Sequence, residues 1–528
     1  MRRYLITTAL PNADGVTQPG DLAGSLLPAD VYARFLRARG EEVLFVSATG
    51  EHGASVELAA HETGLAVGDH CRRQHATQAR FAEEFGLSFD VFGRSSGARV
   101  REQTQYFAKR LEEEGFLEAR STRQLFSPAD GRLPGPTELL DARSAISSSR
   151  DLELRDSRQL YFLQTKLAGA LRDWLSEKHD WPPLGLEQLD EGLEDRIATR
   201  DSRWGVPVPG QGREEKVYCA WFDAPIAWIG ATREWAEAGG DPDAWRQWWR
   251  ASEDVRYVQF AARDEIPFNA VSFPCMFIGS GEKWKLVDYL KAFHGLTYYG
   301  GGLALDGSSG GFMYRGLELL PADCWRYYLT ANAPEAGDAD FSWEALAVAV
   351  NEDLADGFGN FVHRSLAFAD RHFGGAVPAG GEPGPPELEL LEDLDRLLDA
   401  YTERMGALEF RDAIGELRRI WSRGNAYLDR KQPWVAIGSD REDAELTLRF
   451  CLNLASLFAR LSAPTIPFTA NRVLDALAVP DADRGWPSTF KGDELAPAHP
   501  FTVPPVLFGK VAAGDVARWR ALFGTGPG

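Results

Sequence analysis

A strand, a turn and a helix at the N-terminus carry the first groups that could do chemistry. An apolar, β-branched run from Leu5 ends at Pro11, a turn with glycines follows, and from Leu22 to Arg39 apolar residues recur at helical spacing. Such a turn presents backbone N–H groups and a helix start to a phosphate. The strand, turn and helix predict a nucleotide-binding α/β domain. Because the turn lacks the G-x-G-x-x-G spacing, the pattern does not specify which ligand binds.

The elements that must position this turn alternate along the first part of the chain. Strand-like runs at 4–10 and 42–47 alternate with helical patterns at 22–39, 54–62, 67–85 and 99–114, which predicts the first half of a doubly wound parallel sheet. A Gly- and Pro-rich linker precedes long amphipathic patterns that are typical of a helical bundle. The expected boundaries are 1–117 and 210–330 for the two halves of the α/β domain, 118–209 for an insertion, 331–373 for a junction, 374–387 for the linker, 388–480 for the helical domain and 481–528 for the tail.

The composition limits the class of partner and the location. The 57 basic and 78 acidic residues give a net charge of −21, which argues against a protein that coats nucleic acid but leaves room for a local basic groove. The five cysteines are scattered without a C-x-x-C pair, which predicts reduced thiols in a cytoplasmic protein. No leader and no apolar run of membrane-spanning length occurs, so we expect neither secretion nor a membrane partner.

Several long segments resemble a known family. They are TTALPNADG (Thr7–Gly15), ADVYARFLRARG (Ala29–Gly40), VYCAWFDAPIAWIG (Val217–Gly230) and RKQPWVAI (Arg430–Ile437). These segments closely resemble methionyl-tRNA synthetases, and the resemblance extends over about residues 1–477. It implies a Rossmann-type catalytic domain with an inserted connective peptide, followed by an α-helical anticodon-binding domain.

The resemblance also implies an amino-acid pocket. Its apolar positions are filled by Ala9, Leu10, Trp221, Ala224, Pro225, Trp228 and Phe268. Asn12 stands where the family has a tyrosine and Asn269 where it has a histidine, and two amides in an apolar wall predict a ligand more polar than methionine. Gly50 stands where the family has the aspartate that binds the α-amino group. For any one of these aromatic residues, a place in the core is the competing interpretation.

Three further side chains near these segments could take part in catalysis. His52, Asp223 and Asp264 are candidates for ribose binding, amino-group binding or proton transfer. Each could equally be a satisfied structural residue, because a single histidine or aspartate is a weak signal.

The family's phosphate-binding signatures are changed in this chain. Gln18-Pro19-Gly20-Asp21 replaces the HxGH signature, and the loop Leu303–Gly311, where KMSKS is expected, contains no lysine, Arg315 being the nearby cation that could substitute. The nucleotide-binding candidates are Gln18, Gly20, Asp21, His294 and Gly295. Removing one preorganised donor costs about 3 to 4 kcal/mol of transition-state stabilisation. We therefore keep ATP as a candidate ligand but expect it to be cleaved poorly.

Two further expectations concern tRNA and zinc. Asn360 and Arg364, four apart on one helix face, and Trp434 match the residues with which the family recognises the anticodon loop. Stacking on tryptophan and forked donors from arginine suit unpaired bases, whereas the competing interpretation is helix packing and an ion pair. The insertion lacks the cysteine pairs of the family's zinc knuckles, because none occurs between Cys71 and Cys219, so we predict no zinc.

Four functions and a non-functional relic remain open at this stage. The leading hypothesis is an enzyme redirected to aminoacyl activation or transfer in specialised metabolism, such as joining an amino acid to an N-hydroxylated amine, with a separate cupin-type partner. The alternatives are an aminoacyl-tRNA-dependent transferase, a tRNA-binding protein without catalysis, and a conventional methionine–tRNA ligase. A decayed pseudoenzyme is the remaining interpretation.

Overall fold

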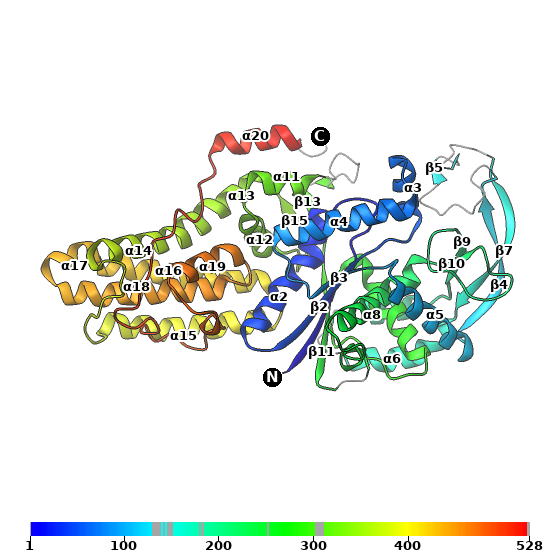
Figure 1. Ribbon diagram of the computed structural model, residues 1–528, viewed down its shortest axis with the longest axis horizontal. Helices are drawn as coiled ribbons and strands as arrows, with labels where there is room; N and C mark the ends of the chain where they lie inside the picture. The colour runs from blue at the N-terminus through cyan, green and yellow to red at the C-terminus, as the bar shows by residue number, and fades with distance from the viewer. Residues whose placement is uncertain are drawn as a thin grey trace.

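Five parallel strands form the sheet of the α/β part in the computed structural model (Figure 1). The structure describes residues 2–128, 139–140, 143–144, 151–178, 181, 184–250, 253–299, 301–302 and 311–524. The strands are β1 (Arg3–Thr8), β2 (Glu42–Thr49), β3 (Val91–Arg94), β11 (Val255–Ala262) and β12 (Tyr289–Phe293), in the order β12-β11-β1-β2-β3. This confirms the predicted doubly wound, Rossmann-type fold.

Helices cover both faces of the sheet, so strand residues are apolar on both sides. Tyr4 and Ile6 of β1 pack in the cluster that includes α2 (Leu27–Ala38), whereas Leu5 packs in the cluster that includes α8 (Ala220–Ala238). Helix α5 (Ala98–Glu113) lies against α8. The strand period of two residues thus divides one apolar run between two cores.

Strand β1 lies at the point where the strand order changes direction, with β2 on one side and β11 on the other. Ligands of open α/β sheets bind beyond the carboxyl ends of the strands at such a point. The residues that directly follow the five strands therefore meet at one edge of the sheet: Ala9, Gly50, Ser95, Arg263 and His294.

The first helix begins earlier than the sequence predicted. The pattern indicated a helix from Leu22 to Arg39, but α1 (Pro19–Asp21) and a π-helical turn η1 (Leu22–Leu26) precede α2 without a break. Pro19 at the first helical position explains this start, because its fixed φ suits a helix and its missing N–H has no partner there anyway. The next two helices are α3 (Ala54–Thr63) and α4 (Val67–Phe85).

The insertion is built on antiparallel strands. Long strands β4 (Leu117–Phe126) and β7 (Glu153–Phe162) pair with each other, β7 pairs with β8 (Arg196–Ile197), and β9 (Thr199–Asp201) pairs with β10 (Lys216–Tyr218). The other elements are β5 (Leu139–Leu140), β6 (Arg143–Ser144), the 3-10 turn η3 (Gln164–Leu167), α6 (Ala168–Ser176) and α7 (Leu184–Glu191). Residues 129–138, 141–142 and 145–150 of the insertion lie outside the described residues, so the predicted lack of zinc knuckles there stays a prediction.

The second half of the α/β part leads into the helical part. Its elements after β10 and α8 are α9 (Arg246–Trp249), η4 (Arg263–Glu265), η5 (Pro267–Ser272), α10 (Phe273–Gly279), β13 (Leu296–Tyr298), β14 (Gly301–Gly302), α11 (Phe312–Leu319), α12 (Ala322–Ala331) and β15 (Ala339–Phe341). The helical part contains α13 (Trp343–Val348), η6 (Ala349–Gly359), α14 (Asn360–Phe373), α15 (Pro385–Gly406), α16 (Phe410–Lys431), α17 (Pro433–Ser439), α18 (Arg441–Ser462) and α19 (Pro467–Ala476). After the short turn η7 (Asp481–Asp483), the tail returns along the molecule and ends in α20 (Ala513–Phe523) beside α13 (Figure 1).

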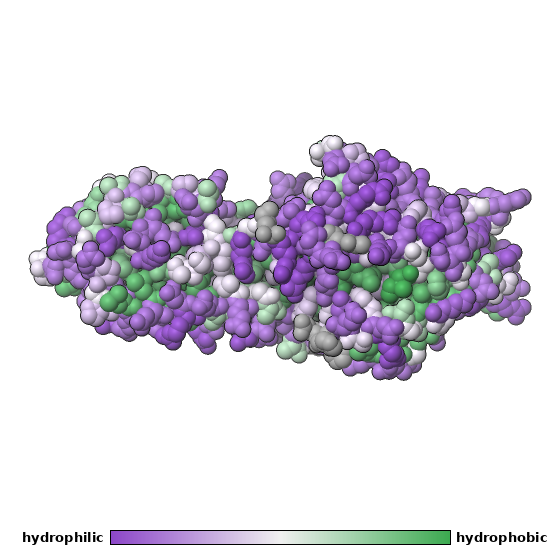
Figure 2. Space-filling model, turned by 90° about the horizontal axis from the view of Figure 1, so that it is seen from below, coloured by the Kyte–Doolittle hydropathy of each residue, from purple (hydrophilic) through white to green (hydrophobic). Residues whose placement is uncertain are grey.

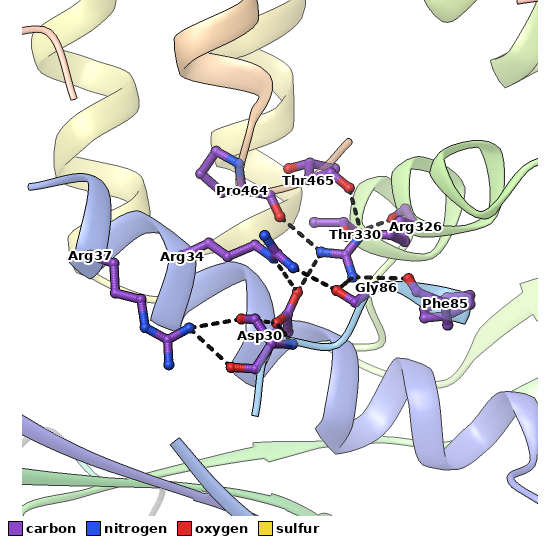
Figure 3. A network of polar contacts seen from close by, with 10 residues as sticks. Asp30, Arg34, Arg37, Phe85, Gly86, Arg326, Thr330, Pro464 and Thr465 are labelled. Carbon is purple, nitrogen blue, oxygen red and sulfur yellow. Dashed lines mark hydrogen bonds and ion pairs between the residues drawn. The ribbon is translucent and has the colours of Figure 1, made fainter. Parts of the chain in front are cut away.

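A buried arginine joins the two parts (Figure 3). Arg326 of α12 donates to the Asp30 carboxylate of α2 at 2.6 Å, and both side chains are 0% exposed. Arg326 also donates to the carbonyl oxygens of Gly86, Pro464 and Thr465, each at 2.9 Å. One guanidinium thus connects the α/β part with the connection between α18 and α19.

The face seen in Figure 2 is mostly hydrophilic, with hydrophobic residues gathered in patches over the α/β part and over the helical part. Within the described residues, every helix is too short or too polar to cross a bilayer.

Candidate active site

A cavity of about 140 Å³ lies at the carboxyl ends of β1, β2, β3 and β11. It is lined by Ala9, Leu10, Asn12, Gly50, His52, Ser95, Ala220, Asp223, Ala224, Trp228, Glu265, Phe268 and Asn269. Most residues predicted for the amino-acid pocket therefore meet here. Trp228 is buried and fixed, because its indole N–H donates to the carbonyl oxygen of Thr8 at 3.0 Å.

Three predicted residues do not line this cavity. The Trp221 indole donates to the Ile197 carbonyl oxygen at 2.9 Å, and the Arg196 guanidinium lies 4.2 Å from the centre of its ring. Pro225 is buried within α8, and Asp264 is exposed on η4. Glu265, the neighbour of Asp264, lines the cavity instead.

His52 and Asp223 form a buried pair in the cavity wall. The Asp223 carboxylate, in the first turn of α8, accepts a short hydrogen bond from Nδ1 of His52. The His52 ring also lies edge-on to Trp204, with ring centres 5.7 Å apart. These contacts orient the imidazole toward the cavity and give Asp223 a positioning role.

Asn12 and Gly50 depend on each other structurally. They form an isolated parallel bridge, in which Gly50 N donates to Pro11 O at 2.9 Å and Ala13 N donates to Gly50 O at 2.8 Å. A Cβ added at Gly50 would lie 3.0 Å from Oδ1 of Asn12. The Asn12 side chain therefore occupies space that a larger residue 50 would need.

Asn269 closes the floor of the cavity together with a second amide. Its Oδ1 accepts a hydrogen bond of 3.1 Å from Nε2 of Gln259, a buried residue of β11. Oε1 of Gln259 is buried and has no hydrogen-bond partner among the described residues. The amide pair makes the base of the cavity polar.

Two carboxylates with raised pKa values lie near each other at this edge. Burial raises the pKa of Glu265 to about 7. The hydrogen bond from Ala262 N–H to its carboxylate lowers this pKa, and the nearby charges of Asp264 and Asp21 raise it further. Burial likewise raises the pKa of Asp21 to about 6, opposed by the hydrogen bond from Gln18 N, and Asp14 raises it further. The edge is therefore acidic where the sequence predicted nucleotide binding.

The predicted nucleotide-binding residues are partly occupied by local contacts. Gln18 N donates to the Asp21 carboxylate at 2.8 Å, so this helix-start donor is already used, whereas Gly20 is open to space. Gly295 N donates to Asp338 at 2.9 Å. Among residues 303–311, only Gly311 is described, and the Arg315 guanidinium lies 4.8 Å from the ring centre of Phe523.

Arg263 is a cation at this edge that the sequence interpretation missed. It follows β11, is exposed, and donates from Nη1 to Nε2 of His294 at 3.2 Å. The signal was present in the sequence, because Arg263 directly precedes the candidate residue Asp264. The Arg263 guanidinium can present positive charge to an anionic ligand, with His294 as its hydrogen-bond partner.

The predicted tRNA-binding residues lie together on the helical part. The Arg364 guanidinium of α14 lies 4.9 Å from the ring centre of Trp434 in α17 and pairs with Asp429 at 3.0 Å. Trp434 is 40% exposed, and Asn360, one turn before Arg364, is exposed as well. The arrangement offers an aromatic face and polar groups on one surface.

Comparison with known proteins identifies the family. The family model described as "tRNA synthetases class I (M)" matches residues 4–134 and 131–366, and the model "Anticodon binding domain of methionyl tRNA ligase" matches residues 377–527. The chain belongs to the methionyl-tRNA synthetase family. It is 46% identical to the methionine–tRNA ligase of Caulobacter vibrioides, with 99% of this chain and 100% of that protein covered. It is 44% identical to the methionine–tRNA ligase of Streptomyces avermitilis over the full length of both.

A solved structure from this family shares the fold. The Mycobacterium tuberculosis methionyl-tRNA synthetase, solved in complex with methionyl-adenylate, is 25% identical and superposes with a TM-score of 0.81 over 96% of this chain and 100% of that one. The chain is therefore related to aminoacyl-tRNA ligases, as the sequence predicted.

The comparisons change the ranking of the sequence-based hypotheses. The relatives of this chain at 44 to 46% identity are methionine–tRNA ligases. The hypothesis of a conventional ligase therefore agrees with the comparisons better than the hypothesis of an enzyme of specialised metabolism. Neither that specialised role nor a cupin-type partner receives support. Among the described residues, no group of three or more His, Cys, Asp or Glu could hold a metal ion, and the absence of zinc stays a prediction.

Proposed function

We propose that this protein is a methionine–tRNA ligase, which joins methionine or a closely similar amino acid to a methionine tRNA with consumption of ATP. The observation that carries this proposal is similarity to such ligases over the whole of both chains, at 46% identity. The cavity at the end of β1 supports it, because Ala9, Leu10 and Trp228 line it as the family resemblance predicts.

Different residues of the chain have different roles in this reaction. Leu10, Ala224, Trp228 and Phe268 exclude water from the amino-acid side chain, and the amides of Asn12 and Asn269 select its polar atoms. His52, oriented by Asp223, faces the same cavity. Asn360, Arg364 and Trp434 bind the anticodon loop, Trp434 as a stacking face.

Activation requires positive charge on the phosphates. An oxygen of the amino acid's carboxylate attacks the α-phosphate, a new P–O bond forms, and pyrophosphate leaves with its negative charge. Arg263, which donates to His294, lies at the strand end where this charge would be neutralised. Asp21 and Glu265 oppose it when ionised, so binding of ATP favours their protonated forms.

A second candidate is an aminoacyl-tRNA-dependent transferase, which takes an already activated aminoacyl group from tRNA and needs no ATP. The observation that favours it is the Asp21 and Glu265 pair at the nucleotide edge. Such an enzyme would retain the amino-acid cavity and the tRNA-binding surface while losing selection for phosphate binding.

Methionine-dependent ATP–pyrophosphate exchange, followed by charging of methionine tRNA, separates the two candidates. The ligase predicts exchange and charging, both lowered in Arg263→Ala and unchanged in the control Arg256→Ala, an arginine within β11. Charging without exchange in the absence of tRNA would still fit a ligase. Absence of both, together with release of methionine from methionyl-tRNA to an added amine, would overturn the ligase and establish the transferase.

A further inference from the structure

A glutamine stands among apolar side chains on one face of the five-stranded sheet. Gln259 lies on β11, and the strand period of two places it on the same face as Tyr257 and Ala261, which pack in the apolar cluster that includes α8. Val258 and Phe260 face the other way, into the cluster that includes α2. Gln259 is 1% exposed. A buried amide in such surroundings costs stability unless its polar atoms find partners, so its presence requires an explanation.

The amide of Gln259 has one hydrogen-bond partner in the described part of the chain. Its Nε2 donates to Oδ1 of Asn269 at 3.1 Å, whereas its Oε1 is buried and unpaired. Exchanging the oxygen and the nitrogen of both amides would instead bury an unpaired NH2 group with two donor hydrogens. An unpaired carbonyl oxygen is tolerated better than an unpaired N–H group, which favours the observed direction of this hydrogen bond.

The direction of this hydrogen bond determines what Asn269 can present to the first cavity. Because Oδ1 is occupied by Gln259, the free polar atom of the Asn269 amide is Nδ2, which donates to no group among the residues that the structure describes. Asn269 lines the cavity together with the apolar side chains of Leu10, Trp228 and Phe268. The cavity therefore combines an apolar wall with a directed donor, and Gln259 sets the direction of that donor from outside the cavity.

We infer that Gln259 is a specificity-determining residue, which positions Asn269 to donate to an acceptor atom in the side chain of the substrate. The inference rests on the proposed use of an amino acid as substrate. A buried donor without an acceptor costs binding free energy, so a side chain with a methylene group at this place is rejected. An oxygen is a stronger acceptor than a thioether sulfur. The substrate class is therefore uncharged amino acids of methionine's length whose side chain carries an acceptor, with oxygen preferred to sulfur.

The test compares three amino acids of nearly the same shape. At one place in the side chain, norleucine has a methylene group, methionine a sulfur and O-methylhomoserine an ether oxygen. Calorimetry measures their binding to the purified protein without ATP or tRNA. O-methylhomoserine should bind roughly 5- to 50-fold more tightly than norleucine, with methionine between them. An apolar pocket without a directed donor gives the reverse order, because the ether oxygen is the most costly of the three groups to desolvate.

Three variants separate positioning from a general effect on stability. Gln259→Met keeps the length of the side chain but removes the donor that orients Asn269, so the preference for the ether over norleucine should fall several-fold. Asn269→Leu should abolish or reverse this preference. The matched control is Ser272→Ala, which removes a buried hydroxyl that donates to Gln164 from the same turn η5 and does not line the cavity. A loss of stability alone weakens the three ligands equally and leaves their ratio unchanged.

The inference is overturned if the wild type binds norleucine as tightly as O-methylhomoserine, or binds none of the three. It is also overturned if Gln259→Met keeps the wild-type preference. Should Gln259→Met fail to fold, Asn269→Leu decides, because a preference that survives without this amide has another origin. Pyrophosphate exchange is a separate measurement. Its absence with all three amino acids, alongside a preference for the ether, would count against the ligase and leave the role of Gln259 standing.

Discussion

At the scale of single residues, the carboxylates Asp21 and Glu265 distinguish this edge of the sheet from a simple phosphate site. Each accepts a backbone N–H of its own turn, from Gln18 and Ala262, so each also closes a turn. Their raised pKa values, about 6 and about 7, mean that the folded protein holds protons that the unfolded chain has released. The edge therefore becomes more negative as pH rises through this range.

Replacing Glu265 by glutamine should stabilise the protein at high pH only. The pKa of Glu265 is about 7 in the folded state, against 4.5 as its ordinary value, so ionisation costs stability from about pH 4.5 upward and the full cost is present above pH 7. Glu265→Gln should gain about 1 to 3 kcal/mol at pH 8 and little at pH 4.5. Urea unfolding at both pH values measures this, with Glu62→Gln, at an exposed position of α3, as control. An equal gain at both values would contradict the assigned pKa.

Restoring a carboxylate at position 50 should restore an anchor for the amino group only if Asn12 is shortened. An aspartate there would push its Cβ to 3.0 Å from Oδ1 of Asn12. Gly50→Asp with Asn12→Ala should bind methionine about 10- to 100-fold more tightly than Gly50→Asp alone, because a charged hydrogen bond contributes roughly 1.5 to 3 kcal/mol. Calorimetry with methionine and its deaminated analogue measures the effect. A gain of the same size with the deaminated analogue would exclude an amino-group anchor.

At the scale of elements, the spacing of apolar residues predicted helix bounds that local sequence determines. Helix α4 begins and ends where its pattern predicted it, at 67–85. The π-helical turn η1 was not predictable, because its widened hydrogen bonding leaves the apolar spacing almost unchanged. The sequence analysis missed Glu265 and Arg263. Both lie on a one-turn element, and the fold decides which residue of such an element faces a cavity. Trp221 matched its motif but packs beside Arg196, because a match in sequence does not fix the direction of a side chain.

The surface formed by α14 and α17 should lose tRNA binding without losing stability when Trp434 is removed. Trp434 is 40% exposed, so Trp434→Ala should lower the affinity for methionine tRNA by roughly 1 to 3 kcal/mol, about 5- to 150-fold, as expected for one stacking face. Val435→Ala, on the same helix with 59% of the residue exposed, is the matched control. Gel shifts and melting temperatures are measured together. A large fall in melting temperature with unchanged binding would make Trp434 a packing residue.

At the scale of the whole molecule, Arg326 joins the two parts from a completely buried position, because it pairs with Asp30 of the α/β part and donates to the carbonyl oxygens of Pro464 and Thr465 in the helical part. Burial alone would raise the pKa of Asp30, but Arg34, Arg326 and two hydrogen bonds from Ser88 lower it to about 2. Asp30 and Arg326 lie 296 positions apart, so no local pattern in the sequence could have indicated the pair.

Breaking this pair should destabilise both parts together. Arg326→Met leaves the Asp30 charge buried with Arg34 as its remaining ion-pair partner, at a cost of about 3 to 5 kcal/mol, whereas Arg326→Met with Asp30→Leu should recover much of that stability. Because its folded pKa lies below the ordinary 3.8, Asp30 contributes stability above about pH 4 that disappears as pH falls toward 2. Chemical unfolding as a function of pH measures both effects. A double variant as unstable as the single one would show that the pair's charge is not the cause.

The contacts of Arg326 also predict that the chain can be divided into two fragments that associate with each other. A cut in the extended segment between α14 and α15 would leave Arg326 on one fragment and its partners Pro464 and Thr465 on the other. Alone, the first fragment would hold a guanidinium without two of its acceptors, so each piece should depend on the other for solubility. Co-expressed fragments, 1–379 and 380–528, should copurify as one complex, and Arg326→Met should abolish that complementation. Fragments that stay soluble and apart would show that the covalent connection, and not the buried arginine, holds the two halves in register.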